Sequence, residues 1–263
     1  MEIMKMNENI HRITLPYKDI FTTVYTVKTD KGVLLFDAAS YDTDLEQHIQ
    51  PALEALKITA EDLKYIFISH NHGDHSGGLR PIMEAYPNAA ILSRSPKLAE
   101  KYAEYKVEAH EDGDKVLDVL QIVTIPGHTV DSAAILDLRT NTMISGDCLQ
   151  LYGIFGSDDW ASNINYPALH LEALAKLRTM DIENIYTAHD YHPYGFKHEG
   201  KAAVAKVITA CEEPLILVKI LIENNPELDD DAIRLKFNAT GTIPTLRKKV
   251  VAEMRAMLAE NKQ

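Results

Sequence analysis

Three histidines and an aspartate fall within six residues directly after a short apolar run, and this motif constrains the fold more than any other part of the chain. The run at residues 65–68 contains only aromatic and β-branched residues, which predicts a short buried strand. Glycines at positions 73, 77 and 78 then favour a loop, and the following spacing predicts a helix over residues 79–86. The motif His70-Asn71-His72-Gly73-Asp74-His75 is therefore expected on a strand-to-helix loop, where functional side chains are common.

The side chains of this motif are metal ligands by type, because imidazole nitrogen and carboxylate oxygen suit zinc, iron or manganese. His70 and His72 are two residues apart in an extended stretch, so they point the same way and can bind one ion. Asp74 and His75 follow a turn and can point elsewhere. Four such ligands indicate two neighbouring ions rather than one closed structural site. The alternative is a surface loop rich in histidine, which would match four fixed positions by chance on the order of once per thousand chains.

Further candidate ligands follow the ends of three later apolar runs. His128 follows a Pro-Gly pair and can supply the third nitrogen that the first loop lacks. Asp147 follows a glycine, and its two carboxylate oxygens can bridge two cations, although a turn residue would look the same. His189 comes directly after residues 184–188, and His192 lies three residues further on. We favour His189 as the ligand because it follows the predicted strand at once.

Together these residues resemble the signature of the metallo-β-lactamase-fold superfamily. The pattern His-x-His-x-Asp-His is complete at residues 70–75, and Ser69 fits the small hydroxyl residue that usually precedes it. The run Pro126-Gly127-His128-Thr129 matches a second element of the family. The resemblance covers about residues 10–195. The family includes hydrolases of the glyoxalase II type. It implies an α+β fold, a four-layer αββα metallo-β-lactamase sandwich with the site at one edge, followed here by a C-terminal helical extension.

The resemblance also implies two divalent metal ions, with Zn²⁺ as the default and iron or manganese as alternatives. An aspartate at the position of Asp37 orients a metal-binding histidine in the family, whereas by itself it would be interpreted as a turn carboxylate. Seven ligands are implied, and all of them are present. Those of the first ion are His70, His72 and His128, those of the second are Asp74, His75 and His189, and Asp147 bridges the two.

Such a site predicts a dinuclear metal-dependent hydrolase. Water between two ions ionises near neutral pH, because metal binding lowers its pKa from about 15.7 to about 7. The metal-bound hydroxide would attack an ester, thioester or similar bond of a small molecule. Asp74 and Asp147 are the predicted catalytic residues, with Asp74 orienting the hydroxide. No serine or cysteine nucleophile is needed.

Other functions are compatible with the same ligands. One is a mono-iron oxidoreductase that resembles persulfide dioxygenases, and another is a protein that anchors a ligand on the metal without turnover. Flavin-linked di-iron members usually carry a carboxylate where this chain has His72, and they carry a flavodoxin-like domain that we do not expect in 263 residues. His189-Asp190-Tyr191 is similar to the His-Glu-Tyr of glyoxalase II enzymes, whereas Gln150 replaces a tyrosine of the lactonases. The choice among thioester, lactone, phosphodiester and β-lactam stays open.

Composition and charge exclude several partners. The chain is 46% hydrophobic and 25% charged, which is ordinary for a soluble globular protein. Its formal net charge of −12 repels phosphate backbones, so nucleic acid is not expected as a partner. No apolar run approaches the ~20 residues of a membrane span, and the N-terminus lacks an apolar signal core. With only two cysteines, Cys148 and Cys211, no disulfide framework is expected. We therefore expect a cytoplasmic protein with no membrane partner and a small-molecule substrate.

The chain is expected to divide into a metallo-β-lactamase-fold domain over residues 1–198 and a helical C-terminal extension over residues 199–263. Prolines such as Pro214 are expected to separate four helical segments in this extension. The extension could pack on the domain, form a homodimer contact, bind a partner or form a wall of the substrate pocket. Residues 149–165 are typical of a lid, or of a loop with packed aromatic side chains. The other predicted strands cover residues 10–15, 21–27, 33–36, 90–92, 116–120, 121–125, 133–137 and 142–145, and the other predicted helices begin near residues 44, 95 and 167.

Overall fold

The computed structural model of the chain describes residues 2–154, 163–239, 246 and 248–260. It divides into two compact units. Unit 1 consists of Met1–Val123 and Ala133–Arg139, and unit 2 consists of Thr124–Ser132 and Thr140–Gln263. The boundary expected between residues 198 and 199 stays a prediction. Within the expected loop at residues 149–165, residues 155–162 lie outside the described residues, so the role of the loop as a lid also stays a prediction.

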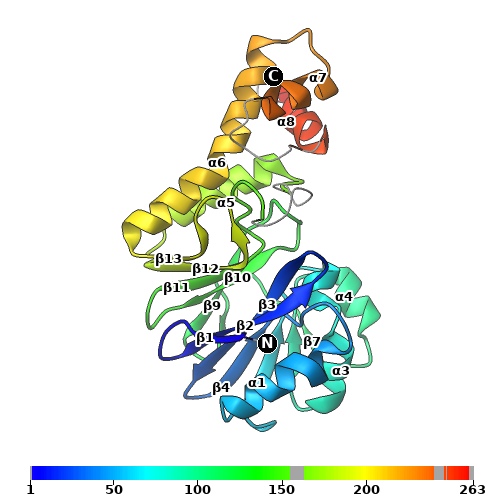
Figure 1. The fold of residues 1–263 in the computed structure, drawn as a ribbon, viewed down its shortest axis with the longest axis vertical. Helices are drawn as coiled ribbons and strands as arrows, with labels where there is room; N and C mark the ends of the chain where they lie inside the picture. Colours follow the sequence, from blue (N-terminus) through cyan, green and yellow to red (C-terminus); the bar gives the residue numbers. More distant parts are fainter. Residues whose placement is uncertain (1, 155–162, 240–245, 247, 261–263) are drawn as a thin grey trace. The chain divides into compact units, whose positions relative to one another are not determined.

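Unit 1 is built on a seven-stranded sheet in which the strands follow one another in chain order, β1 to β7 (Figure 1). The first four strands pair antiparallel through tight hairpins. From β4 onward the strands pair in parallel, because helical crossovers separate them. The strands are β1 Glu2–Lys5, β2 Ile10–Tyr17, β3 Ile20–Thr29, β4 Gly32–Phe36, β5 Leu63–Phe67, β6 Ala90–Leu92 and β7 Val107–Glu108.

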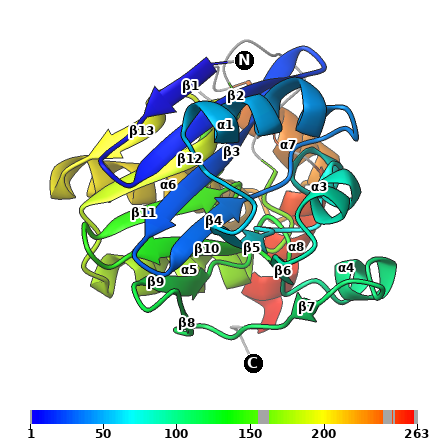
Figure 2. The same cartoon turned by 90° about the horizontal axis from the view of Figure 1, so that it is seen from below.

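Helices cover one face of this sheet (Figure 2). The crossovers are η1 Leu45–Ile49 with α1 Gln50–Ala55, then α2 Gly73–Ser76 with α3 Leu79–Ala85, and α4 Pro96–Lys101. Leu53 and Ile82 from the helices share one apolar cluster with Leu35 from the sheet. Along β4 the next residue, Phe36, points to the opposite face and stacks on Phe67, with ring centroids 5.2 Å apart. Both faces of the central strands are therefore apolar, as the continuous apolar run at residues 65–68 requires.

Three more strands complete unit 1, and here one strand prediction was wrong. They are β8 Lys115–Val116, β9 Leu120–Thr124 and β10 Ala133–Asp137. The expected strand over residues 116–120 is broken, because Leu117 and Asp118 have φ angles of 47° and 66°. These left-handed residues form the turn of an antiparallel hairpin between β8 and β9. The apolar pattern alone did not reveal that turn, because it contains no glycine.

In its described residues, unit 2 combines three strands with four helices. Strand β11 Thr142–Gly146 pairs in parallel with β12 Asn184–Tyr191, which pairs antiparallel with β13 Gly195–Glu199. Helix α6 Lys201–Asn224 packs along β12 and β13, and it contacts α5 Pro167–Thr179 (Figure 1). The helices α7 Asp230–Asn238 and α8 Lys248–Glu260 close an apolar cluster with α6 around Val218, Phe237 and Val251. Within the part of the chain that the structure describes, no helix is long and apolar enough to cross a bilayer.

The prediction that Pro214 separates two helices was wrong, since α6 runs through it as one helix of 24 residues. Proline removes one backbone hydrogen bond, which favours a break or a kink in an exposed helix. Here Pro214 is buried together with Cys211, Leu215 and Val218. We infer that burial of this apolar face offsets the lost hydrogen bond, a tertiary effect that local propensity does not register.

Candidate metal centre

The first group of donors lies on the turn that leads from β5 through α2 in unit 1. Hydrogen bonds hold this turn against the rest of the unit, among them Ala38 N to His75 O and Thr22 Oγ1 to Asp74 O, both at 2.7 Å. Gly77 is needed for this close approach, because a Cβ atom there would lie 2.0 Å from Ser40 O. The expected loop thus contains a short helix, α2, that had not been predicted.

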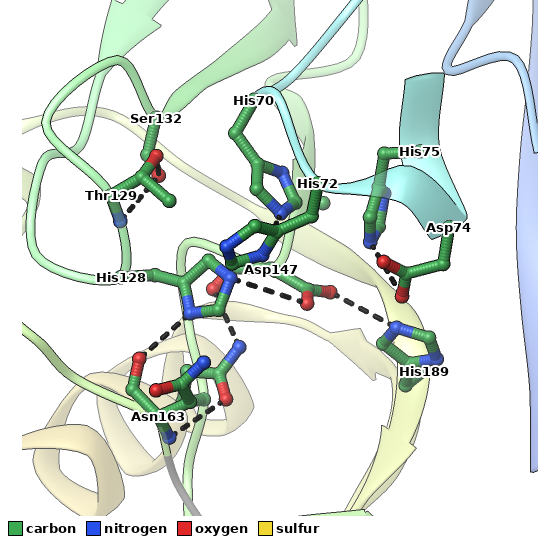
Figure 3. A network of polar contacts seen from close by, with 12 residues as sticks. His70, His72, Asp74, His75, His128, Thr129, Ser132, Asp147, Asn163 and His189 are labelled. Carbon is green, nitrogen blue, oxygen red and sulfur yellow. Dashed lines mark hydrogen bonds and ion pairs between the residues drawn. The ribbon is translucent and has the colours of Figure 1, made fainter. Parts of the chain in front are cut away.

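The four donors of unit 1 converge in two pairs (Figure 3). His70 Nε2 lies 3.0 Å from His72 Nδ1, as expected for two side chains that point the same way. His75 Nε2 lies 3.4 Å from an oxygen of Asp74. The rings of His70 and His75 are buried, with centroids 4.3 Å apart, whereas His72 and Asp74 are only partly covered. The structure therefore brings together the donors that the motif predicted within this unit.

Asp37 lies behind these donors and fixes two of the histidines. Its carboxylate accepts from His75 Nδ1 at 2.7 Å and from the backbone N and Oγ of Ser69 at 2.8 and 3.0 Å. Since the Ser69 hydroxyl donates to Asp37, its oxygen accepts from His70 Nδ1, at 3.0 Å. Both histidines are then protonated on Nδ1 and present the lone pair of Nε2. Burial raises the pKa of the Asp37 carboxyl, although His75 and Ser69 oppose that shift.

The second group of donors lies in unit 2 and begins with His128. Its Nδ1 lies 2.7 Å from Asn163 O, which can only accept, so the proton is on Nδ1 and the lone pair is on Nε2. Asn165 Nδ2 also donates to His128 O at 2.7 Å. Gly127 has a φ of +150°, and a Cβ atom there would lie 2.4 Å from the ring of His170. The Pro-Gly pair therefore serves to bring the backbone close to α5.

Asp147 lies between the two histidines of this group (Figure 3). Its Oδ2 lies 3.7 Å from His128 Nε2, and its Oδ1 lies 3.3 Å from His189 Nε2. Both histidines and Asp147 are buried. His189 belongs to β12, which continues two residues beyond it, so the strand does not end at the ligand as expected. His192 is in neither group of candidate metal ligands among the described residues.

Two residues of this neighbourhood were missed as functional candidates. Tyr191 OH donates to Asp147 Oδ1 at 2.9 Å, and Gln150 Nε2 donates to Asp147 O at 3.0 Å. The sequence holds a signal for both, since Tyr191 belongs to His189-Asp190-Tyr191 and Gln150 stands where lactonases carry a tyrosine, but both signals concern the substrate and not Asp147. The contact joins Tyr191 of β12 to Asp147, the residue that follows β11, and such a contact has no local pattern in the sequence. Cys148, next to the proposed ligand, is a buried free cysteine.

His170 gives unit 2 a pH-dependent stability that can be measured. This ring is fully buried, and burial lowers its pKa from the ordinary value of 6.5 to about 4. The unfolded chain therefore takes up this proton near pH 6.5, whereas the folded chain takes it up only near pH 4. We expect the free energy of unfolding to fall by about 3 kcal/mol from this group as the pH drops from 7 to 4. Urea unfolding of metal-free wild type and His170→Gln at both pH values checks this, and equal pH dependence of the two would contradict it.

Comparison with known proteins identifies the family. The sequence model of the metallo-beta-lactamase superfamily matches residues 17–189, more than half of the chain. The chain belongs to this superfamily. It is 25% identical over 211 residues to a hydroxyacylglutathione hydrolase of Photobacterium profundum. The aligned residues cover 76% of this chain and 70% of that hydrolase. It is 27% identical over 174 residues to an atrochrysone carboxyl ACP thioesterase of Aspergillus aculeatus, which covers 64% of this chain. The chain spans only 50% of that thioesterase.

A solved structure with the same fold covers almost the whole chain. It is a metallo-beta-lactamase family protein from Thermus thermophilus, with a TM-score of 0.65 at 18% identity, covering 98% of this chain and 95% of that one. At this identity the likeness concerns the fold alone, and it confirms the expected α+β metallo-β-lactamase sandwich with a C-terminal helical region. Flavodiiron proteins share the fold as well, for example one from Giardia intestinalis with a TM-score of 0.64.

The donors fit a divalent metal by their chemistry. They are only imidazole nitrogens and carboxylate oxygens, the ligands that zinc and iron accept. The hydrogen bonds to Asp37, Ser69 and Asn163 place the proton of three histidines on Nδ1, so Nε2 is the nitrogen that would bind a metal. A buried cluster of this kind, in a chain of this superfamily, indicates metal binding.

Proposed function

We propose that the chain is a dinuclear metal-dependent hydrolase that cleaves an ester, thioester or similar bond of a small molecule. The donors of the two units would act together, a pairing that rests on family membership and on ligand chemistry. Zinc is the metal that this donor set favours, with iron or manganese as alternatives. In this assignment the first ion is bound by His70, His72 and His128, the second by Asp74, His75 and His189, and Asp147 bridges them.

The observation that carries the two-ion proposal is the position of the Asp147 carboxylate. Its two oxygens face two different histidines, Oδ1 toward His189 Nε2 at 3.3 Å and Oδ2 toward His128 Nε2 at 3.7 Å. A carboxylate that serves one ion does not need this arrangement, whereas one that bridges two ions does. The tautomer of His128 supports the same reading, because its Nε2 carries the lone pair.

The residues of the chain would divide the chemistry between them. When bound, a pair of divalent ions lowers the pKa of a water to near neutrality and polarises the bond under attack. Asp74, whose carboxylate is partly exposed, can accept a hydrogen bond from that water and orient it toward the substrate. His70, His75 and His189 are buried, so bulk water does not compete for their nitrogens. Asp37 and Ser69 hold two of these rings in place.

Thioesters and esters are the substrates that we favour. Hydroxyacylglutathione hydrolases and an acyl carrier protein thioesterase are among the relatives. Tyr191 follows His189 by two residues, as in the motif His-Glu-Tyr that His189-Asp190-Tyr191 resembles. Tyr191 is buried here and donates to Asp147, so in this chain it serves the metal ligand rather than a substrate.

Metal analysis combined with a substrate panel tests this proposal. We expect about two divalent ions per chain and hydrolysis of at least one thioester or ester among thioester, lactone, phosphodiester and β-lactam probes. Fewer than about one ion per chain would contradict the two-ion assignment. About one iron per chain with consumption of a persulfide would favour the oxidoreductase instead. Full metal content without turnover of any probe would favour a metal-anchored binding protein.

A further inference from the structure

A continuous series of hydrogen bonds in unit 2 links Asp147 to His128 through residues that are not proposed as ligands. Tyr191 OH donates to Asp147 Oδ1 at 2.9 Å, and Gln150 Nε2 donates to Tyr191 OH at 3.3 Å. On its other side, Gln150 Oε1 accepts from Asn163 N at 3.1 Å. Asn163 O then accepts from His128 Nδ1 at 2.7 Å. The series therefore begins at the proposed bridging carboxylate and ends at a proposed histidine ligand.

The direction of each bond in this series is determined by chemistry. A carboxylate oxygen only accepts, so the single hydroxyl hydrogen of Tyr191 is used on Asp147. The Tyr191 oxygen must then accept from the amide of Gln150. If that amide were reversed, its oxygen would face the acceptor Asp147 O and its NH₂ group would face the donor Asn163 N. Neither pair could form a hydrogen bond. The Gln150 side chain thus has one orientation that satisfies its neighbours.

Burial makes this arrangement rigid. Tyr191 is 0% exposed and Gln150 is 3% exposed, so water cannot easily replace a bond that is lost. The two side chains also come from distant parts of the sequence, with Gln150 just after β11 and Tyr191 at the end of β12. They therefore tie the segments that carry Asp147, His189 and, through the backbone of Asn163, His128.

We propose that Gln150 and Tyr191 are positioning residues, which set the orientation of the Asp147 carboxylate and the tautomer of His128 before a metal binds. This inference rests on the proposed metal site. The Tyr191 hydroxyl donates to Oδ1, so the two oxygens of the Asp147 carboxylate differ in their hydrogen bonding. In the proposed site they would therefore bind the two ions unequally. The pair acts on the ligands only and touches no substrate.

Metal affinity is the readout that separates positioning from simple packing. Tyr191→Phe removes one oxygen and keeps the ring, and Gln150→Met keeps the length of the side chain without its amide. The matched control is Tyr186→Phe, which removes the hydroxyl of another buried tyrosine of β12, one that donates to Glu199 at 3.4 Å. Each metal-free protein is titrated with Zn²⁺ against a chromophoric chelator and with Co²⁺ by visible absorption. Thermal unfolding of the metal-free forms monitors the fold.

We expect Tyr191→Phe and Gln150→Met each to weaken Zn²⁺ binding by about 10–100-fold and to change the Co²⁺ spectrum. The control should stay within about twofold. Because Gln150 and Tyr191 share a hydrogen bond, the double variant should lose less than the two single losses combined. Unchanged Zn²⁺ affinity in a folded Tyr191→Phe or Gln150→Met overturns the inference but leaves the proposed function standing. If one of the two variants does not fold, the result of the other variant decides. A wild type that binds neither metal overturns both.

Discussion

Replacing His72 with alanine is expected to lower kcat/KM for the hydrolysed ester or thioester by at least about 10³-fold, which corresponds to about 4 kcal/mol of transition-state stabilisation. His72 lies in the same donor pair as His70, with 3.0 Å between their nitrogens. Its loss would remove one of the three histidines proposed for the first ion, which weakens binding of that ion and changes the geometry of the ligands that remain. The measurement is steady-state hydrolysis of the probe that the wild type cleaves, with metal content determined on the same samples.

A histidine outside both groups of candidate ligands provides the control for this experiment. His48 belongs to η1 of unit 1, and His48→Ala should keep the wild-type rate within about threefold. Equal cleavage of the probe by His72→Ala and by the wild type would contradict the catalytic assignment. A parallel pair, His189→Ala and His192→Ala, should show loss only for His189 and so decide between the two candidates near the end of β12.

Local pattern was enough to predict the donors of unit 1 but not what holds them. His70, His72, Asp74 and His75 are close in sequence, so the strand-to-helix reading of residues 65–86 placed them together. Asp37 was predicted to orient a metal-binding histidine, and the structure shows it contacting His75 directly and His70 through Ser69. The resemblance to the family suggested that Asp37 orients a histidine, but its contact with His70 through Ser69 depends on the pairing of β4 with β5.

Tertiary contacts explain the predictions that were wrong or missing. Pro214 was interpreted as a break because local propensity disfavours it, whereas burial keeps α6 continuous. The turn at Leu117 and Asp118 carries no glycine, so the apolar pattern suggested a strand. Tyr191 meets Asp147 across 44 positions of sequence, and only the register of β11 and β12 brings them together. Such contacts between distant residues leave no periodic signal in a single sequence.

Asp37 is the position where we expect the largest effect on stability. Its carboxylate is fully buried and accepts three hydrogen bonds, two from Ser69 and one from His75. Asp37→Ala would leave these donors without an acceptor in a buried site, and it would force alanine into a backbone with φ of 66°. We expect the free energy of unfolding to fall by about 3–5 kcal/mol, measured by urea denaturation of the metal-free protein at pH 7. An unfolding midpoint equal to that of the wild type would contradict this role.

Asp37→Asn separates the role of Asp37 in metal binding from its role in stability. Asparagine tolerates a positive φ and has the same shape, so the fold should survive with a smaller loss than in Asp37→Ala. Its NH₂ group, however, would face His75 Nδ1, which now donates to the carboxylate at 2.7 Å. His75 would then be protonated on Nε2, the nitrogen proposed to bind metal. We expect Zn²⁺ affinity about 10–100-fold below that of the wild type in a folded protein. Wild-type affinity in Asp37→Asn would show that the tautomer of His75 does not depend on this carboxylate.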